Sequence, residues 1–271
     1  MPKAKPILLL FAVIQSMYMG GLYVKTVLGM ETLHGTTLAA LLNEKEIVVA
    51  ADSRLVRGID TPDPNPMCKI RQFDNIFVTA FGLYGETTSG FDLWRIVSIS
   101  AHGSSGVSEK IKHCDTSLRS PLKSALAQIK KLNPVLFEKN FALKPALGVI
   151  FFGLEDNTLK LKYLQFDASS STDASLSLNV KSLECPGMIC PDRKFGFLLV
   201  GADSQSEAET FVKSHRVEVG KGNLADVARK FVQMTIDKNS VAYGPPIDVI
   251  SVSKDGAKWI QTKDEGLEIK K

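Results

Sequence analysis

Two pairs of apolar runs, each joined by a short polar turn, limit the folds open to this chain. The first pair spans residues 36–51 around the turn Asn43–Glu46. The second pair joins residues 147–154 to residues 159–166 through the turn at 155–158. Apolar runs of this length beside polar turns are typical of β-hairpins. We therefore predict antiparallel sheet at the centre of the fold.

The segments between these hairpins have a different pattern. Apolar residues recur at intervals of three and four, which predicts helical structure over 87–133, 206–214 and 224–238. Ser120-Pro121 is a point at which the first of these segments would kink or divide. Further strands are expected at 69–80, 195–200, 247–253 and 258–262, and loops at 58–66 and 169–175.

The order of these elements is strands, two helices, strands, two helices, strands. Two antiparallel sheets with helix pairs on their outer faces would satisfy this order with a single hydrophobic core. We therefore predict an α+β fold built as a four-layer αββα sandwich. No domain boundary is evident after residue 35, so residues 36–271 are expected to form one domain and residues 1–35 a separate leader.

Composition excludes several classes of function. The 33 basic and 29 acidic residues give a net charge of +4, and the basic residues are scattered rather than gathered into the basic face that nucleic-acid binding needs. The chain has no phosphate-binding glycine loop, and its four cysteines and four histidines lack zinc-ligand spacing. We predict no metal, no cofactor and no nucleic-acid partner. Cys185 and Cys190 form either a small disulfide or two free thiols.

The N-terminus has the plan of an export signal. Residues 7–24 carry no charge, follow Lys3 and Lys5, and end at Lys25. A signal cleaved near Val27–Gly29 is the favoured interpretation, and the protein would then be secreted or periplasmic. An uncleaved anchor, which would hold the exported chain on the membrane through residues 7–24, and a buried core helix are the alternatives.

The segment His34–Arg54, HGTTLAALLNEKEIVVAADSR, resembles the start of a mature proteasome β-subunit. Gly58, the pair Lys69-Ile70 and Gly82 follow in the order that the family shows. The run GPPIDVISV from Gly244 resembles the family's penultimate strand. The resemblance implies an N-terminal nucleophile (Ntn) hydrolase, a threonine peptidase with the four-layer αββα fold.

The chemistry of such a site follows from the properties of threonine. A threonine hydroxyl needs a base within hydrogen-bond reach before it can attack an amide. A free α-amino group, with a pKa of about 7.7 to 8.0, accepts a proton near neutral pH. The resemblance implies that self-cleavage between Gly35 and Thr36 discards a propeptide. Thr36 would then supply both the nucleophile and the base.

The resemblance also assigns roles to neighbouring residues. Lys69 would lower the pKa of the Thr36 amine and hydroxyl, and Asp52 would keep that lysine charged and oriented. The amide N–H of Gly82 would donate to the oxyanion. Asp52 follows Thr36 by 16 positions and Lys69 follows Asp52 by 17, one more than in the family. We place the extra residue in the proline-rich loop at 58–66.

The chain departs from the family at supporting positions. A serine of the family falls at Ala202, in the turn Gly201-Ala202-Asp203-Ser204. Asp237 and Ser240 are of the right kinds to help hold the threonine amine, and Arg54 is a further supporting candidate. We expect these departures to affect the rate of the reaction and not its type.

Three functions remain open. The first is a self-processing threonine hydrolase that cleaves peptide bonds and, like its family, assembles as a homo-oligomeric ring. The second is a non-catalytic scaffold or membrane-anchored binding subunit of the same fold. The third is an amidase for a small non-peptide substrate. Cys68 as a nucleophile is disfavoured, because no histidine is placed to serve it.

Overall fold

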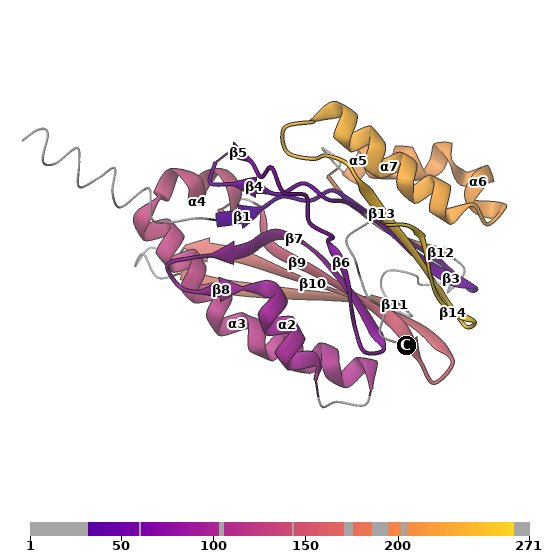
Figure 1. The fold of residues 1–271 in the computed structure, drawn as a ribbon, viewed down its shortest axis with the longest axis horizontal. Helices are drawn as coiled ribbons and strands as arrows, with labels where there is room; N and C mark the ends of the chain where they lie inside the picture. Colours follow the sequence, from indigo (N-terminus) through magenta and orange to yellow (C-terminus); the bar gives the residue numbers. More distant parts are fainter. Residues whose placement is uncertain are drawn as a thin grey trace, which may run out of the picture.

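The computed structural model describes residues 32–59, 61–102, 106–142, 144–170, 176–185, 195–201 and 205–262. Within these residues the strands form two antiparallel sheets, one of nine strands and one of five. The same residues contain six helices, which lie beside the sheets (Figure 1). The predicted α+β class with antiparallel sheets is therefore confirmed.

The smaller sheet has the strand order β12-β2-β3-β13-β14. These strands are β12 (Phe195–Val200), β2 (Leu38–Asn43), β3 (Glu46–Asp52), β13 (Ile247–Ser253) and β14 (Gly256–Gln261). The β2–β3 turn closes on the Asn43 side chain, whose Oδ1 accepts hydrogen bonds from the N–H groups of Lys45 and Glu46 at 2.8 and 2.9 Å. Asparagine suits such turns because its side chain bonds to nearby backbone. The first predicted hairpin is confirmed.

The larger sheet has the order β11-β10-β9-β7-β1-β4-β5, and β6 and β8 also pair with β7. Its strands are β1 (Thr32–His34), β4 (Val56–Arg57), β5 (Thr61–Pro62), β6 (Ile70–Phe73), β7 (Ile76–Glu86), β8 (Phe91–Asp92), β9 (Pro145–Glu155), β10 (Thr158–Ser170) and β11 (Leu176–Cys185). The second predicted hairpin, β9 with β10, is confirmed. Its turn residues Asp156 and Asn157 have φ of 49° and 58°, and positive φ at both central positions matches the twist of the flanking strands.

Several predictions of local structure fail. The short strands β5 and β8 lie within the predicted loop at 58–66 and the predicted helical segment 87–133. The single strand expected over 69–80 is wrong, because the chain reverses at Asp74-Asn75 and forms the hairpin β6–β7. Asp74 adopts a φ of 53°, which aspartate tolerates in tight turns. Strand β11 was not predicted, since only its first and last residues, Leu176 and Cys185, are buried and its hydrophobic pattern is weak.

The helices are α2 (Leu93–Ala101), α3 (Val107–Leu132), α4 (Pro134–Asn140), α5 (Gln205–Ser214), α6 (Arg216–Gly220) and α7 (Leu224–Lys238). Asp92 caps α2 by accepting a hydrogen bond from the Arg95 N–H at 3.0 Å. Pro121 does not divide α3, because Leu118 and Leu122 on either side keep that face of the helix buried against the core. The two short helices, α4 and α6, were not predicted.

Three hydrophobic clusters hold these elements together. One cluster lies between the two sheets and includes Leu38 and Val49 of the smaller sheet. From the larger sheet it includes Phe77 and Phe152, whose rings stack with centroids 5.5 Å apart. A second cluster packs α2, α3 and α4 against the larger sheet, and a third packs α7 against the smaller sheet. Figure 1 shows these two helix groups on opposite sides of the sheets.

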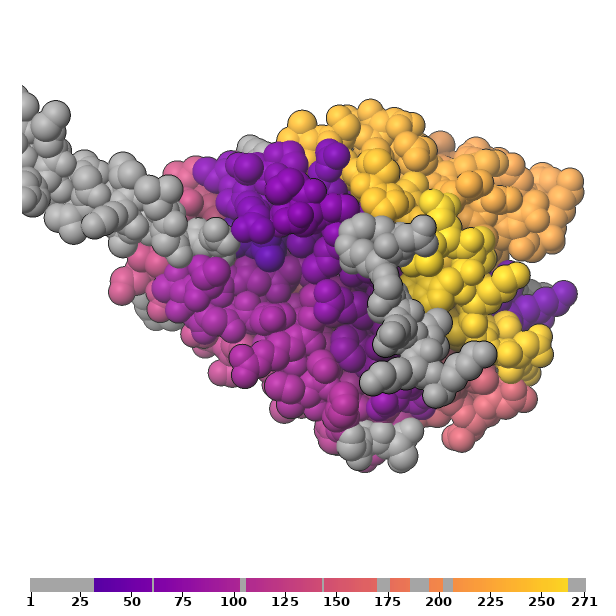
Figure 2. Space-filling view, viewed as in Figure 1, coloured from indigo at the N-terminus to yellow at the C-terminus, as the bar shows by residue number. Residues whose placement is uncertain are grey.

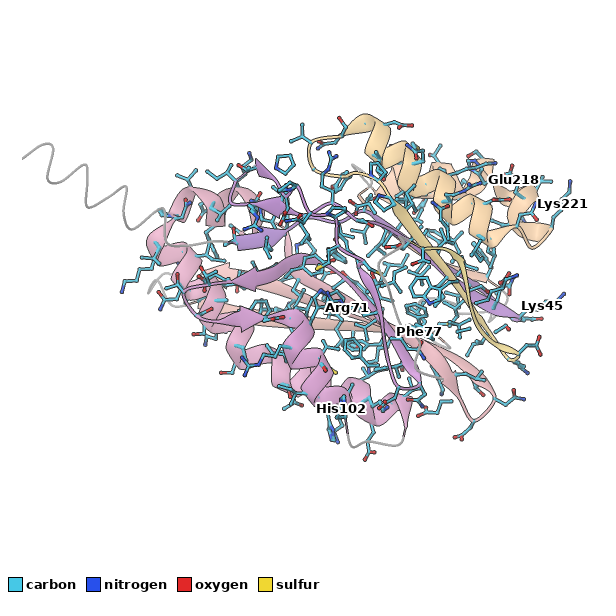
Figure 3. The ribbon with its side chains drawn as sticks, in the orientation of Figure 1. Lys45, Arg71, Phe77, His102, Glu218 and Lys221 are labelled. Carbon is cyan, nitrogen blue, oxygen red and sulfur yellow. The ribbon has the colours of Figure 1, made fainter. Side chains whose placement is uncertain are left out.

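The side chains follow the same division. Figure 3 shows Phe77 and Arg71 among the interior side chains, whereas Lys45, Glu218 and Lys221 lie at the periphery. Fully buried charged groups are therefore exceptions, and Asp52 and Lys69 are two of them.

Several sequence predictions concern the leader and the cysteines. Among the described residues, no helix is long and apolar enough to cross a lipid bilayer. The apolar segment 7–24 lies outside the described residues, as does Cys190. Cys185 is disulfide-bonded, whereas Cys68 and Cys114 are free thiols.

Candidate active site

The hairpin β2–β3 brings Asp52 to the start of β2. Leu38 pairs with Ala51, so the residues that precede β2 lie beside the residue that ends β3. The Asp52 N–H donates to the Thr37 carbonyl at 3.1 Å, and the Thr37 N–H donates to Asp52 Oδ1 at 2.9 Å. The 16-residue separation of Thr36 and Asp52 is thus closed by the register of one hairpin.

Lys69 joins the same cluster from the segment that precedes β6. Its side chain is 0% exposed, and Nζ lies 2.8 Å from Asp52 Oδ1. Nζ also donates to the carbonyl oxygen of Gly35 at 3.0 Å and to that of Arg54. The three ammonium protons therefore have three acceptors, and one acceptor is the carbonyl at the predicted cleavage site.

Burial and charge act on Lys69 in opposite directions. Burial lowers the pKa of the Lys69 ammonium below its ordinary value of 10.5, and the negative charge of Asp52 opposes that change. Asp52 is itself fully buried, and Oδ2 accepts hydrogen bonds from the N–H groups of Arg54 and Gly244, each at 3.1 Å. Four hydrogen-bond donors thus offset the cost of burying the Asp52 carboxylate. The carboxylate in turn offsets the cost of burying the Lys69 ammonium.

Thr36 lies against the carbonyl that precedes it. Its side-chain oxygen is 2.5 Å from the Gly35 carbonyl oxygen and 2.7 Å from the hydroxyl oxygen of Tyr84. The Tyr84 hydroxyl donates to the Ala80 carbonyl, so the Thr36 proton serves either of two acceptors. The residue is only 4% exposed, and the hydroxyl is therefore held beside the Gly35–Thr36 bond.

Gly35 has a backbone conformation that favours glycine. Its φ is 95°, and a Cβ placed there would make only ordinary contacts, with Val56 at 3.5 Å and the Ala242 carbonyl at 3.6 Å. The requirement for glycine is therefore conformational rather than steric.

The three residues before Gly35 form β1, which we call the leader strand. It lies between two strands of the larger sheet, with Leu33 paired to Gly85 of β7 and to Arg57 of β4. Figure 2 shows the indigo and violet surface of the N-terminal strands adjoining the orange and yellow surface of the C-terminal part. The segment before the predicted cut is therefore a strand of the larger sheet, between β4 and β7.

Gly82 lies next to Leu83, which pairs with His34 of the leader strand. Its φ is 92°, and a Cβ there would lie 2.4 Å from the Ala146 carbonyl oxygen, so no other residue fits. The Gly35 carbonyl oxygen is instead contacted by Lys69 and Thr36. The role of the Gly82 N–H as an oxyanion donor stays a prediction.

The supporting residues differ in their positions. Arg54 enters the cluster through its backbone and donates from Nη1 to the Ser240 carbonyl. Ser240 is exposed and contributes this carbonyl rather than its hydroxyl. Asp237 is exposed on α7, where its carboxylate accepts a hydrogen bond from Gln233 at 2.7 Å, so it is not brought to Thr36. Ala202 lies outside the described residues.

Tyr84 is the site residue that sequence reasoning missed. It lies two positions after Gly82 in β7, and alternate residues of a strand face the same side. That spacing is the signal that points to it. Burial raises the pKa of the Tyr84 phenol well above its ordinary value of 10, so the hydroxyl is neutral and acts as a hydrogen-bonding group.

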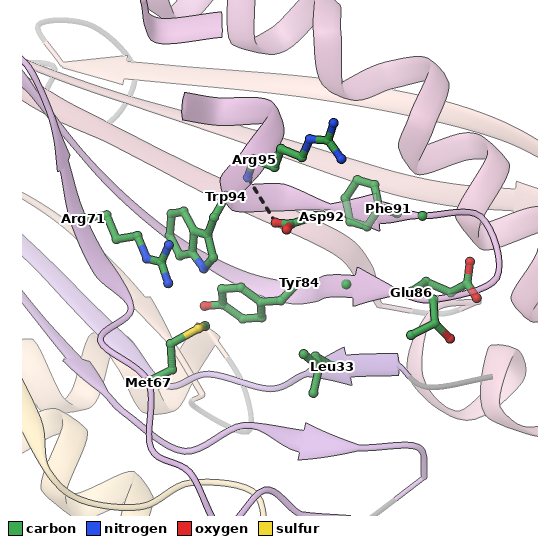
Figure 4. Close-up of a pocket in the computed structure, with 12 residues that line it drawn as sticks. Leu33, Met67, Arg71, Tyr84, Glu86, Phe91, Asp92, Trp94 and Arg95 are labelled. Carbon is green, nitrogen blue, oxygen red and sulfur yellow. Dashed lines mark hydrogen bonds between the residues drawn. The ribbon is translucent and has the colours of Figure 1, made fainter. Parts of the chain in front are cut away.

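A cavity of about 480 Å³ adjoins the site on the other side of Tyr84 (Figure 4). It is lined by Leu33, Met67, Arg71, Tyr84, Gly85, Glu86, Thr87, Gly90, Phe91, Asp92, Trp94 and Arg95. Its lining combines aromatic rings with charged side chains, which is typical of small-ligand and side-chain sites.

No protein-family model matches this chain, and no curated protein matches it either.

Two other chemistries can be compared with the geometry. Burial raises the pKa of the Cys68 thiol to about 12, and the thiol donates to the Ile70 carbonyl at 3.0 Å, so it is not a nucleophile near neutral pH. Among the described residues, no three His, Cys, Asp or Glu side chains are grouped to hold a metal ion. The site offers a hydroxyl, an ammonium and a carboxylate, which suit acyl transfer.

Proposed function

We propose that this chain is the precursor of a self-processing threonine hydrolase of the proteasome β-subunit type, which cleaves peptide bonds. Thr36 is the nucleophile in both self-cleavage and turnover. The observation that carries the proposal is the meeting of three groups on one bond. The Thr36 hydroxyl, the Lys69 ammonium and, through Lys69, the Asp52 carboxylate converge on the Gly35 carbonyl.

This geometry supports self-cleavage by the following steps. The Thr36 Oγ attacks the Gly35 carbonyl carbon, and the Lys69 ammonium, 3.0 Å from the carbonyl oxygen, stabilises the negative charge that develops there. The new C–O bond replaces the C–N bond, and the hydroxyl proton ends on the Thr36 nitrogen. Water then hydrolyses the ester, which leaves a Gly35 carboxylate and an N-terminal Thr36.

Turnover uses the amine that self-cleavage creates. The α-amino group of Thr36 accepts the hydroxyl proton, and the oxygen attacks the substrate carbonyl to form an acyl-enzyme ester. The proton passes to the departing amine, and water hydrolyses the ester. The neighbouring positive charge of Lys69 lowers the pKa of the α-amine, so the amine is a free base near neutral pH.

The pairing of the leader strand supports a peptide as the substrate. The leader strand pairs with β7 and β4 through its backbone, and after its removal those strand edges are free to bind another extended segment. A small non-peptide amide would not need two strand edges. This favours a peptidase over the small-molecule amidase.

The wider arrangement supports the same family. Helices pack on the larger sheet and α7 packs on the smaller sheet, with a third cluster between the sheets; we propose that this is the four-layer Ntn hydrolase fold. The disulfide at Cys185 supports export, because disulfides persist in oxidising compartments.

The non-catalytic alternative rests on two observations. Asp237 and the Ser240 hydroxyl are not at the Thr36 site, and the leader strand closes it. If the chain stays uncut, Thr36 has no free amine, and the protein would act as a scaffold or an anchored binding subunit.

The proposal is tested by peptide hydrolysis with the purified protein. Wild type and Thr36→Ser are expected to cleave a mixed peptide library, and Thr36→Ala is expected to be inactive. Thr116→Ala, at an exposed threonine of α3, is the matched control and keeps full activity. Equal hydrolysis by Thr36→Ala and wild type would contradict a threonine nucleophile.

A further inference from the structure

The cavity behind Tyr84 is separated from the nucleophile by one side chain. The Tyr84 ring lines the cavity, while its hydroxyl oxygen lies 2.7 Å from the Thr36 oxygen. Leu33 of the leader strand also lines it. Removal of the leader would therefore widen a cavity that already adjoins the reacting group.

Arg71 places a positive charge in this cavity, and the Asp92 carboxylate of the lining acts on that charge without pairing with it directly. Its guanidinium carbon lies 4.6 Å from the centroid of the Trp94 ring, and Figure 4 shows the group directed toward Tyr84. Among the described residues, Arg71 forms no ion pair and no hydrogen bond through its guanidinium, and the negative charge of Asp92 reaches it only from a longer distance. Burial lowers the pKa of Arg71, which is the effect of a guanidinium partly removed from water.

The other charged groups of the cavity already have partners or face solvent. The Glu86 carboxylate is 2% exposed and accepts hydrogen bonds from the N–H groups of Thr88 and Ser89, both at 2.6 Å. Asp92 caps helix α2, and Arg95 is an exposed residue of that helix. Arg71 is thus the charged side chain of the cavity that has neither a direct hydrogen-bond partner nor full exposure to solvent.

We infer that this cavity binds an acidic side chain of the substrate, and that Arg71 is the residue that selects it. The inference rests on the proposed function for its substrate. The leader strand shows which part of the substrate is meant, because Leu33, three residues before Thr36, lines the cavity. The acidic side chain therefore belongs to the third residue before the cleaved bond.

The chemistry of the two groups explains the selectivity. A guanidinium donates two parallel hydrogen bonds to one carboxylate, and such charged hydrogen bonds are about twice as strong as neutral ones. Glutamine, a neutral side chain of the same shape, offers Arg71 one acceptor oxygen and no negative charge. We expect roughly a 10- to 100-fold preference for glutamate over glutamine at this position in kcat/KM.

A double-mutant cycle tests the inference without relying on hydrolysis. In the full chain with Thr36→Ala, which keeps the leader strand in place, Leu33→Glu is compared with Leu33→Gln by thermal unfolding. We expect the glutamate variant to melt about 4 °C or more above the glutamine variant. The difference disappears with Arg71→Met or with Arg71→Gln, and it persists with Arg95→Met, the matched control within the cavity.

The outcomes separate this inference from the proposed function. Equal melting temperatures for the two Leu33 variants, or a difference that survives both Arg71 substitutions, would overturn the role of Arg71. The melting difference together with no hydrolysis of peptides that carry glutamate or glutamine at the third position would leave Arg71 as an acid-binding residue and contradict the hydrolase. Cleavage of both peptides at equal rates would contradict the inference alone.

Discussion

Two lysines of this protein have side chains almost entirely removed from solvent, and their surroundings differ. Lys69 is 0% exposed and pairs with Asp52, which is also 0% exposed. Lys110 is 2% exposed, but its partner Asp74, at 3.0 Å, is 60% exposed. The first pair lies wholly in the interior, whereas the second reaches the surface at the β6–β7 turn.

The difference indicates which role each charge suits. Lys110 joins α3 to a turn, and its carboxylate partner remains in water, so the pair links two elements at small cost. Lys69 donates two of its three hydrogen bonds to backbone carbonyls. One of these is the Gly35 carbonyl at the predicted cut. A charge buried to that extent and aimed at one peptide bond suits a catalytic role better than a structural one.

Replacing each lysine gives the largest expected contrast. Lys69→Met should slow self-cleavage by at least about 100-fold, because the developing oxyanion loses its donor. It should also destabilise the fold by about 3 to 5 kcal/mol, since Asp52 is left buried without its counter-charge. Lys110→Met should leave cleavage unchanged and cost no more than about 1 kcal/mol. Intact mass and denaturant unfolding measure the two effects, and equal cleavage rates would contradict the role of Lys69.

Replacing each carboxylate should give a smaller contrast. Asp52→Asn keeps the shape of the side chain but removes the charge that holds Lys69 as an ammonium, so we expect self-cleavage to slow by about 10- to 100-fold. Asp74→Asn is the matched control and should cleave at the rate of wild type. Time courses of the cut fraction provide the measurement. A normal rate for Asp52→Asn would show that Lys69 stays charged without it.

The two lysine–aspartate pairs should respond to pH in different ranges, the Lys69 pair at alkaline pH and the Asp74 pair at acid pH. Because the pKa of Lys69 is lowered below 10.5, self-cleavage should fall at an alkaline pH below that value, as the ammonium deprotonates. Between the lowered pKa and 10.5 the unfolded chain binds more protons at this lysine, so its contribution to stability rises with pH.

The Asp74 pair responds in the acid range. Its hydrogen bond to Lys110 lowers the pKa of Asp74 below 3.8, so the stability it contributes is present above pH 3.8 and is lost as the pH falls through the lowered pKa. Melting temperatures across pH, for wild type and Asp74→Asn, measure this. Curves that stay parallel below pH 3.8 would contradict it.

Removing the Tyr84 hydroxyl should have the smallest effect. Tyr84→Phe deletes one acceptor of the Thr36 proton but leaves the Gly35 carbonyl contact, so we expect a change in the rate of self-cleavage of less than about 10-fold. Tyr163→Phe, which removes another largely buried tyrosine hydroxyl, is the control for stability. A complete loss of cleavage in Tyr84→Phe alone would make Tyr84 essential and revise the site.

The meeting of Thr36 and Asp52 was predictable from the sequence. The apolar runs on either side of Asn43 set the register of one hairpin, and that register places residue 52 beside residue 37. Lys69 was predictable only through the family resemblance, because its position depends on the path of the proline-rich loop. Local pattern does not determine such a path.

The errors also have physical causes. The turn at Asp74-Asn75 interrupts an apolar run with only two polar residues, so the hydrophobic pattern did not separate β6 from β7. The strand β11 has few buried side chains, and its pattern carries little information. Tyr84 contacts Thr36 across 48 residues of sequence, a contact that only the assembled sheet defines.

The most direct test of the account is the N-terminal sequence and intact mass of the purified protein beside Thr36→Ala. The account predicts a wild-type chain that begins at Thr36, a Thr36→Ala chain that remains joined at Gly35, and a Thr116→Ala control that is cut like wild type. Two chains with the same N-terminus before residue 35 would contradict self-cleavage, and the site would then belong to a non-catalytic protein.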